Sequence, residues 1–156
     1  MKIFTQFILL MSMAVPAFAL QAGDTLSAFK IENQFEEPAE LNAETKWIIF
    51  SSDMNAAKIL TEYLNANAKD MDLTKTLVIS DISKMPGLVS KMFAIPKMKK
   101  YGFKLALDKE GDVTKAWPRQ EGVITVMKVA ALKVESTKEL KTKEDVTAFF
   151  TEDFKK

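Results

Sequence analysis

The chain has 156 residues, of which 47% are hydrophobic and 28% charged, and its formal net charge at neutral pH is +1. This composition is typical of a folded globular protein and not of a disordered one. The near balance of charge gives no electrostatic reason to expect a nucleic acid or an anionic lipid as a partner. The sequence has no cysteine and no histidine. These two absences exclude thiol catalysis and remove the commonest metal ligand and general base.

The first nineteen residues have the organisation of a cleavable signal peptide. Met1-Lys2 gives a positive start, residues 3–15 are mostly apolar, and Ala17-Phe18-Ala19 is a small-residue cleavage motif. A retained anchor or a buried helix is the alternative interpretation, but the apolar run is short for a membrane span. We expect export to the periplasm, no membrane association after cleavage, and one domain over residues 20–156.

The first half of this region predicts two strands and a helix. Alternating apolar residues at Leu26, Phe29 and Ile31 predict a short strand, and residues 36–38 then form a turn. Residues 47–50 are continuously apolar, which is typical of a strand covered on both faces. That strand ends at a polar corner, where Ser52 or Asp53 can cap a helix expected over residues 54–68.

The middle of the chain predicts a strand, a divided helix and an extended segment. Residues 77–79 form a second buried strand, and Pro86-Gly87 opens a helical stretch that carries an apolar stripe of Leu88, Met92 and Ile95. Pro96 should kink or divide this helix because proline lacks the amide hydrogen that a helix interior needs. Residues 103–107 alternate as an extended piece, and a short helix is expected around residues 113–117.

The C-terminal part predicts a hairpin followed by a helix. Residues 123–129 are rich in β-branched residues and predict the clearest strand of the chain. The turn to the next strand lacks the Asn-Gly or Asp-Gly that tight hairpins prefer, which leaves the register there open. Thr142-x-x-Asp145 matches a capping box before a last amphipathic helix. Together these elements predict an α/β fold with a mixed sheet and helices on both faces.

This order of elements resembles the thioredoxin-like fold with the N-terminal extension and central insertion of TlpA-like and peroxiredoxin-like proteins. The resemblance covers about residues 23–152, and its first part rests on Gly23-Asp24, Phe29, Ile31, Asn33-Gln34 and Leu41. A narrower resemblance, to the exported YtfJ-type group, rests on Asp81, Pro86-Gly87, Lys97–Lys100, Phe103, Asp108, Gly111 and Ala116-Trp117.

The departures from this pattern bear on function. Redox-active relatives carry a C-x-x-C motif where this chain has Met54-Asn55-Ala56-Ala57, and a cis-proline where it has Ile124. A cis bond without proline costs about 2.5–4 kcal/mol, so we expect a trans peptide at Val123–Ile124. The resemblance thus implies a degenerate active-site corner with a structural role, made of Ser52, Asp53, Met54, Asn55, Ala57 and Ile124.

We therefore expect a redox-inactive, non-enzymatic protein that needs no cofactor and acts by binding an unknown periplasmic protein or a small ligand, not a nucleic acid. One alternative is a Cu(I) carrier, because thioethers bind Cu(I) and Met85, Met92 and Met98 recur at near-helical spacing. Methionines also fill core gaps, so a packing role is an alternative to copper binding.

A carboxylate-dependent enzyme is a further alternative. The basic segment Lys97–Lys100 could meet an anion or an acidic partner, although a solvated helix face is the simpler interpretation.

Overall fold

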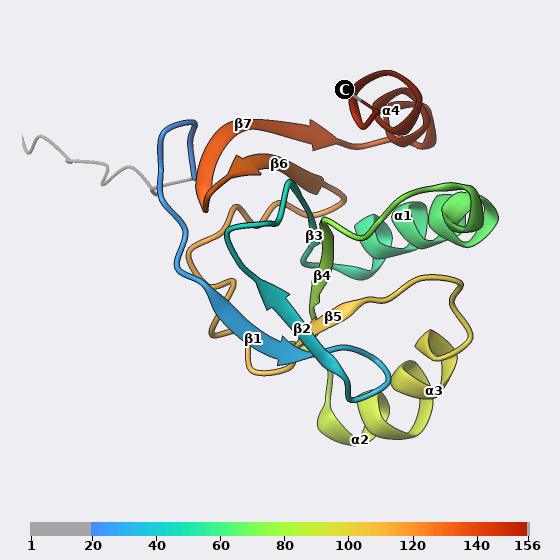
Figure 1. Cartoon of the computed structure of the whole chain (residues 1–156). Coiled ribbons are helices and arrows are strands. Elements are labelled where there is room, and N and C mark those ends of the chain that lie inside the picture. Colours follow the sequence, from blue (N-terminus) through green and yellow to red (C-terminus); the bar gives the residue numbers. More distant parts are fainter. Residues whose placement is uncertain (1–19, 156) are drawn as a thin grey trace, which may run out of the picture.

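The computed structural model describes residues 20–155, and the expected signal peptide lies outside this range. Its centre is a five-stranded mixed sheet in the order β5-β4-β3-β6-β7, beside a separate β1-β2 hairpin (Figure 1). The strands are β1 (Phe29–Glu32), β2 (Pro38–Leu41), β3 (Trp47–Ser51), β4 (Thr76–Asp81), β5 (Ala106–Asp108), β6 (Ile124–Ala130) and β7 (Lys133–Leu140). The helical segments are α1 (Met54–Asn67), η1 (Ala68–Asp70), α2 (Gly87–Val89), the π-helical turn η2 (Ser90–Ala94), α3 (Ile95–Met98), α4 (Lys143–Ala148) and η3 (Phe149–Asp153).

The sheet combines parallel and antiparallel pairs as the sequence predicts. Strands β3, β4 and β5 are mutually parallel, whereas β6 runs antiparallel to β3 and β7 antiparallel to β6. Strands β3 and β4 are buried along almost their whole length, which explains their continuous apolar sequences. The mixed α/β fold is thus confirmed.

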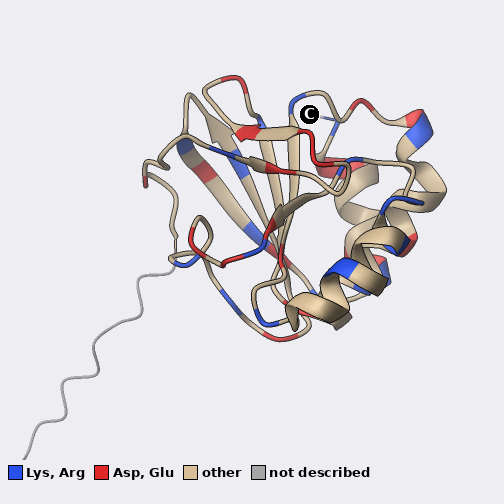
Figure 2. Cartoon of the chain, turned by 90° about the horizontal axis from the view of Figure 1, so that it is seen from below, with Lys and Arg blue, Asp and Glu red and all other residues tan. Residues whose placement is uncertain are grey.

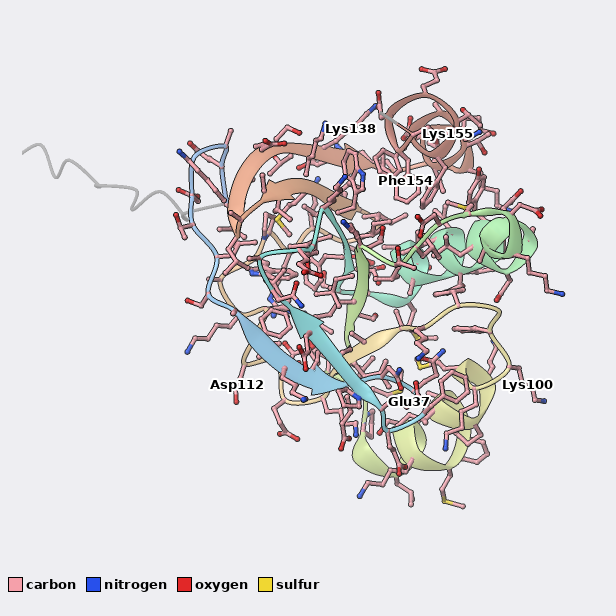
Figure 3. All side chains as sticks on the ribbon, in the orientation of Figure 1. Glu37, Lys100, Asp112, Lys138, Phe154 and Lys155 are labelled. Atoms are coloured by element: carbon pink, nitrogen blue, oxygen red, sulfur yellow. The ribbon has the colours of Figure 1, made fainter. Side chains whose placement is uncertain are left out.

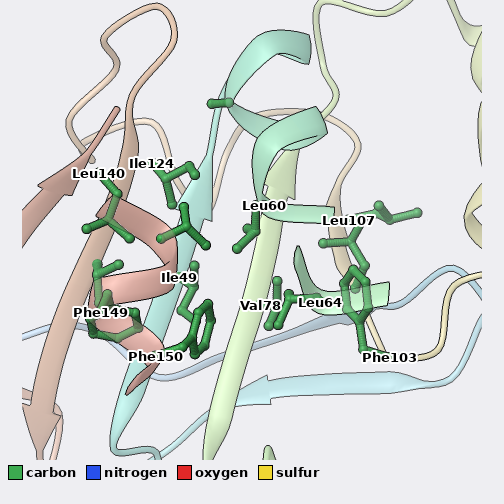
Figure 4. Close-up of a cluster of buried hydrophobic side chains, with 14 of the residues drawn as sticks. Ile49, Leu60, Leu64, Val78, Phe103, Leu107, Ile124, Leu140, Phe149 and Phe150 are labelled. Atoms are coloured by element: carbon green, nitrogen blue, oxygen red, sulfur yellow. The ribbon is translucent and has the colours of Figure 1, made fainter. Parts of the chain in front are cut away.

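Two hydrophobic clusters fill the two faces of the sheet. The first cluster places Ile49, Val78 and Ile124 of the sheet against side chains of α1 and of the α4-η3 region (Figure 4). The second cluster lies on the opposite face, where alternate strand residues such as Ile48 and Phe50 meet Trp117 and the β1-β2 hairpin. Residues 20–155 contribute a buried hydrophobic cluster to each face of the sheet, so we expect the chain over residues 20–156 to fold as one domain.

The helices differ from the expected arrangement in one respect. Every helical residue of the two clusters belongs to the first cluster, so the helices pack on one face, and the hairpin and the 113–117 loop cover the other. The cause is the strand order. Strand β4 lies next to β3, and β5 lies on the far side of β4, so the two crossover connections both lead in the same direction across the sheet. Two right-handed crossover connections that lead in the same direction across a sheet lie on the same face of it. No helix among residues 20–155 is long and apolar enough to cross a bilayer.

Three local elements also differ from the sequence-based expectation. Residues 38–41, expected to follow a turn, form β2, which pairs with β1. The expected extended piece is regular only at Ala106–Asp108. The short helix expected at residues 113–117 is a series of turns, because the Asp108 carboxylate binds both the backbone and the hydroxyl of Thr114.

The helix over residues 87–98 is divided close to the predicted proline. The N–H of Ile95 donates to the carbonyl of Ser90, five residues earlier, which makes a π-type turn just before Pro96. The final helix begins with the predicted capping box between Thr142 and Asp145. Hydrogen bonds from the backbone N–H groups of Lys141 and Thr142 hold the pKa of the Asp145 carboxyl below its usual value.

The β6-β7 hairpin closes with a two-residue turn made of unusual residues. Ala131 and Leu132 have φ angles of 47° and 67°, which is the left-handed conformation that a type I′ turn requires at both positions. Leu132 is held there because it packs partly against the second cluster and its carbonyl accepts a hydrogen bond from the N–H of Leu26. Tertiary contacts thus impose a turn that the local sequence does not favour.

We predict that Ala131→Asn stabilises the protein by about 0.5–1 kcal/mol, because asparagine adopts the left-handed conformation at lower cost than alanine. The measurement is the free energy of unfolding from urea titration. Ala130→Asn, one residue earlier in β6, is the matched control and should give no gain. Equal stability of the Ala131→Asn variant and the wild type would contradict the claim that alanine is unfavourable in the left-handed conformation of this turn.

Candidate functional site

The candidate site is the corner between β3 and α1. Strand β3 ends at the buried Ser51, whose hydroxyl donates to the hydroxyl of Ser80 on β4 at 3.1 Å. Asp53 then adopts an extended backbone conformation and caps α1, which begins at Met54. Of the two capping candidates in the sequence, the structure therefore selects Asp53 and not Ser52.

The Asp53 carboxylate joins two segments that are distant in sequence. Its Oδ1 atom accepts hydrogen bonds from the N–H groups of Asn55 and Ala56 at 2.8 and 3.1 Å. Its Oδ2 atom accepts a hydrogen bond from the N–H of Gly122, in the loop before β6, at 3.0 Å. The anion is thus placed at the positive end of α1, where the helix dipole favours it, and it ties this end to the loop.

That loop leads directly into Ile124, the second half of the expected corner. Ile124 pairs with Ser51 across the β3-β6 ladder and is fully buried in the first cluster. The described residues contain no cis peptide bond, so the Val123–Ile124 bond is trans as expected. The strand-to-helix corner and the loop before Ile124 therefore face one another.

The remaining residues of the corner bring little chemistry to it. Met54 is 78% exposed and Asn55 is also exposed, whereas the backbone N–H of Ala57 donates to the carbonyl of Asp53. The ionised group of the corner, Asp53, already accepts three backbone hydrogen bonds. The corner offers neither a thiolate nor an imidazole as a nucleophile or base.

A second polar cluster, which we call the arginine cluster, lies where β4 and β5 end. It consists of Asp81, Asp108, Thr114 and Arg119. Arg119 forms an ion pair with the buried Asp81 and donates a second hydrogen bond to the Thr114 hydroxyl at 3.0 Å. Thr114 in turn donates its hydroxyl to Asp108 at 2.7 Å.

Arg119 connects the arginine cluster to the corner. Its guanidinium lies 5.9 Å from the ring centroid of Phe50, the residue before Ser51. Arg119 also belongs to the same loop as Gly122, the hydrogen-bond partner of Asp53. The ion pair with Asp81 therefore fixes the loop from one side while Asp53 fixes it from the other.

The sequence reasoning did not identify Arg119 as a site residue, although one signal was present. Arg119 is the only arginine in a chain whose other 21 basic residues are lysines. Arginine has a planar fork of donors that can bind two acceptors at once, which lysine cannot do in the same geometry. Asp81 and Asp108 both end strands, and the parallel pairing of β4 with β5 places them side by side.

The three methionines of the copper hypothesis occupy different environments. Met98 packs partly against the first cluster, Met92 is 60% exposed, and Met85 lies in a bend before α2. The described residues also contain no group of three carboxylates that could hold a metal ion. The packing role of Met98 is therefore visible in the structure, whereas a common site for the three sulfur atoms is not.

The buried carboxylates do not support the hypothesis of a carboxylate-dependent enzyme. Among the described residues, no buried side-chain oxygen or nitrogen lacks a hydrogen-bond partner. A large depression, about 820 Å³ and open to solvent, is lined by residues such as Lys46, Trp47 and Thr76 at the start of β3 and β4. It lies at the opposite end of β3 from the corner, and its lining includes neither Asp81 nor Asp108.

The fold is thioredoxin-like. Peroxidoxin BcpB from Mycobacterium tuberculosis is 14% identical to this chain, and the match covers 85% of this chain and 95% of that one with a TM-score of 0.57. The thioredoxin domain of a thiol-disulfide oxidoreductase from Bacteroides vulgatus is 16% identical, with 84% and 99% of the two chains covered and a TM-score of 0.55. A mutant of PrxQ from Xylella fastidiosa is 10% identical, with 85% and 94% covered and a TM-score of 0.59. No family model matches the sequence, and no curated protein does either. At these identities the likeness concerns the fold alone.

We predict that Asp53→Ala lowers the free energy of unfolding by about 2 kcal/mol, because it removes the helix cap and the hydrogen bond to Gly122 together. Asp53→Ser should lose only about half as much, since serine caps a helix but its shorter side chain does not reach Gly122. The exposed Asp112→Ala is the matched control, with an expected change within about 0.5 kcal/mol. Equal losses for Asp53→Ala and Asp53→Ser would contradict the bridging role.

We predict that Arg119→Ala costs about 3 kcal/mol of stability, because the Asp81 carboxylate stays buried without its ion-pair partner. Arg119→Lys should restore only part of this loss, since a lysine cannot also hold Thr114. Lys115→Ala, in the same loop, is the control. Denaturant titration of the three variants measures the differences, and full stability of Arg119→Lys would show that the guanidinium fork is dispensable.

Proposed function

We propose that this protein is an exported, redox-inactive, thioredoxin-like protein of the YtfJ-type group, which acts in the periplasm by binding a protein partner. The observation that carries the proposal is the state of the β3-α1 corner. Where redox-active relatives hold the two cysteines, this chain has Met54 and Ala57, and the carboxylate of the preceding Asp53 accepts hydrogen bonds from three backbone N–H groups.

The chemistry of the corner supports binding over catalysis. Thiol exchange and thiol peroxidase reactions require a thiolate as the attacking group, and the whole sequence contains no cysteine. The helix N-terminus that would stabilise a thiolate already has its anion in Asp53. The corner is retained, but Met54 and Ala57 at the motif positions supply no thiolate, and the neighbouring Asp53 holds the corner together.

Export and the YtfJ-type grouping rest on sequence patterns. The segment Met1–Ala19 supports export. The residues shared with the YtfJ-type group include Asp108, Gly111 and Trp117, and these shape the loop that carries Arg119. A binding protein of this type needs no cofactor, and the charge balance of the chain gives no reason to include nucleic acids among its partners.

The proposal predicts that the chain turns over neither disulfides nor peroxides. It also predicts that the immobilised chain retains a specific protein. Purified chain should neither accelerate insulin reduction by dithiothreitol nor decompose hydrogen peroxide, and immobilised chain should retain a defined protein from a periplasmic extract. The variant Met54→Glu, which places a charge at the exposed start of α1, tests whether the corner itself is the contact.

Three results would contradict this function. Turnover in either assay would show chemistry that does not use thiols. Retention of Cu(I) against a competing chelator would favour metal transport by the methionines. Failure of wild-type chain to retain any protein under conditions in which it is folded would exclude the binding role.

A further inference from the structure

The helix over residues 87–98 presents its hydrophobic side chains to solvent. Leu88, Val89, Met92 and Phe93 are 71%, 44%, 60% and 66% exposed, whereas Ser90 is buried and donates its hydroxyl to the carbonyl of Gly87. The sequence predicts Leu88, Met92 and Ile95 as one apolar stripe, but only Ile95 packs against the first cluster. We call the four exposed side chains the apolar ridge.

The π-helical turn places these side chains together. In a turn with bonds between residues five apart, positions four and five residues apart lie on the same side. Leu88 therefore lies beside Met92 and Phe93, and Val89 lies beside Phe93, with the turn itself at Ser90–Ala94. Exposed clusters of large apolar side chains mark surfaces that bind something.

The segment of the chain that carries the apolar ridge has charge of one sign. Residues 82–107 contain six lysines and neither Asp nor Glu, although the whole chain is nearly neutral. Figure 2 looks toward this helix from below, and Figure 3 shows Lys100 extending away from the protein. Lys104 is paired with Glu37. The other five, all exposed, form no ion pair with any residue of the described chain: Lys84, Lys91, Lys97, Lys99 and Lys100.

We propose that this helix binds the surface of an anionic lipid membrane. The apolar ridge enters the boundary between headgroups and acyl chains, and the five free lysines contact the lipid phosphates. This proposal does not depend on the corner or on the proposed function. It also departs from the expectation, drawn from the overall charge, that no membrane is bound, because the positive charge is concentrated on one segment.

The form of the surface favours lipid over a folded acidic protein. The helix that carries the ridge lies at the lower edge of the molecule in Figure 1, and neither the large depression nor a smaller one near Lys58 includes any of the ridge side chains. Exposed apolar side chains that lie outside any depression suit a fluid, deformable layer, whereas a folded partner protein would need a groove of its own to receive them. All the free cations are lysines, which act as point charges toward many phosphates without demanding one geometry. Apolar insertion and a basic cluster are the two signals that together give stable membrane attachment.

The test is sedimentation of the chain over residues 20–156 with lipid vesicles. Vesicles of phosphatidylcholine alone are compared with vesicles that contain about one third phosphatidylglycerol. We expect binding to the anionic vesicles at least about tenfold tighter than to the neutral ones, and weaker binding at high salt. All substituted positions below are exposed, so the variants should stay folded, which thermal melting verifies.

Two double variants and one matched control assign the surface. Leu88→Ser with Phe93→Ser removes half of the ridge, and Lys91→Glu with Lys99→Glu reverses two charges beside it. Each should weaken binding to the anionic vesicles by at least about tenfold. Lys115→Glu with Lys133→Glu changes the net charge equally at exposed positions elsewhere and should leave binding within about twofold.

Several outcomes would overturn the proposal. Absence of binding to anionic vesicles is the first, and an equal loss in the Lys115/Lys133 control is the second. Retention of the chain on polyglutamate without vesicle binding would assign the surface to an acidic protein. A wild-type dimer that the Leu88/Phe93 variant converts to a monomer in sedimentation velocity, again without vesicle binding, would assign the ridge to a second copy of the chain.

Discussion

The arrangement of the corner depends on one carboxylate. Asp53 accepts hydrogen bonds from the start of α1 and from Gly122, so it determines both where the helix begins and where the loop before β6 lies. Helix N-termini hold anions because their first N–H groups have no partner within the helix and the helix dipole is positive there. A thiolate uses the same environment for reactivity, whereas a carboxylate in the same place only stabilises the structure. The corner of this chain is held together by a carboxylate and contains no thiol.

The loop between β5 and β6 is fixed from both ends, which makes it a rigid part of the protein despite its lack of regular structure. Asp108 holds its start through Thr114, Asp81 holds Arg119, and Asp53 holds its end. Because each buried carboxylate has its partners within the protein, none is left to act on a substrate. The same pairing places the polar groups at the carboxyl ends of β4 and β5, where open α/β sheets commonly bind ligands.

The most unusual distribution of side chains lies away from the corner. The helix over residues 87–98 buries a serine and exposes a phenylalanine, the reverse of what folding alone favours. Such an inversion is stable only if the rest of the domain provides enough core, and here two clusters on opposite faces of the sheet do so. A binding role proposed for this surface and the absence of a thiol at the corner are therefore compatible.

Local patterns in the sequence determined the elements whose causes are local. The continuous apolar runs of β3 and β4 and the capping box at Thr142 each depend on neighbouring residues and were predictable, whereas the sequence limited the cap of α1 only to Ser52 or Asp53. Only the tertiary structure decided features whose causes are distant in the chain. The pairing of β2 with β1, the left-handed turn at Ala131-Leu132 and the ion pair of Arg119 all need partners that sequence spacing does not reveal. The same holds for Leu88 and Met92, because helical spacing shows that residues share a face but not whether that face meets the core or the solvent.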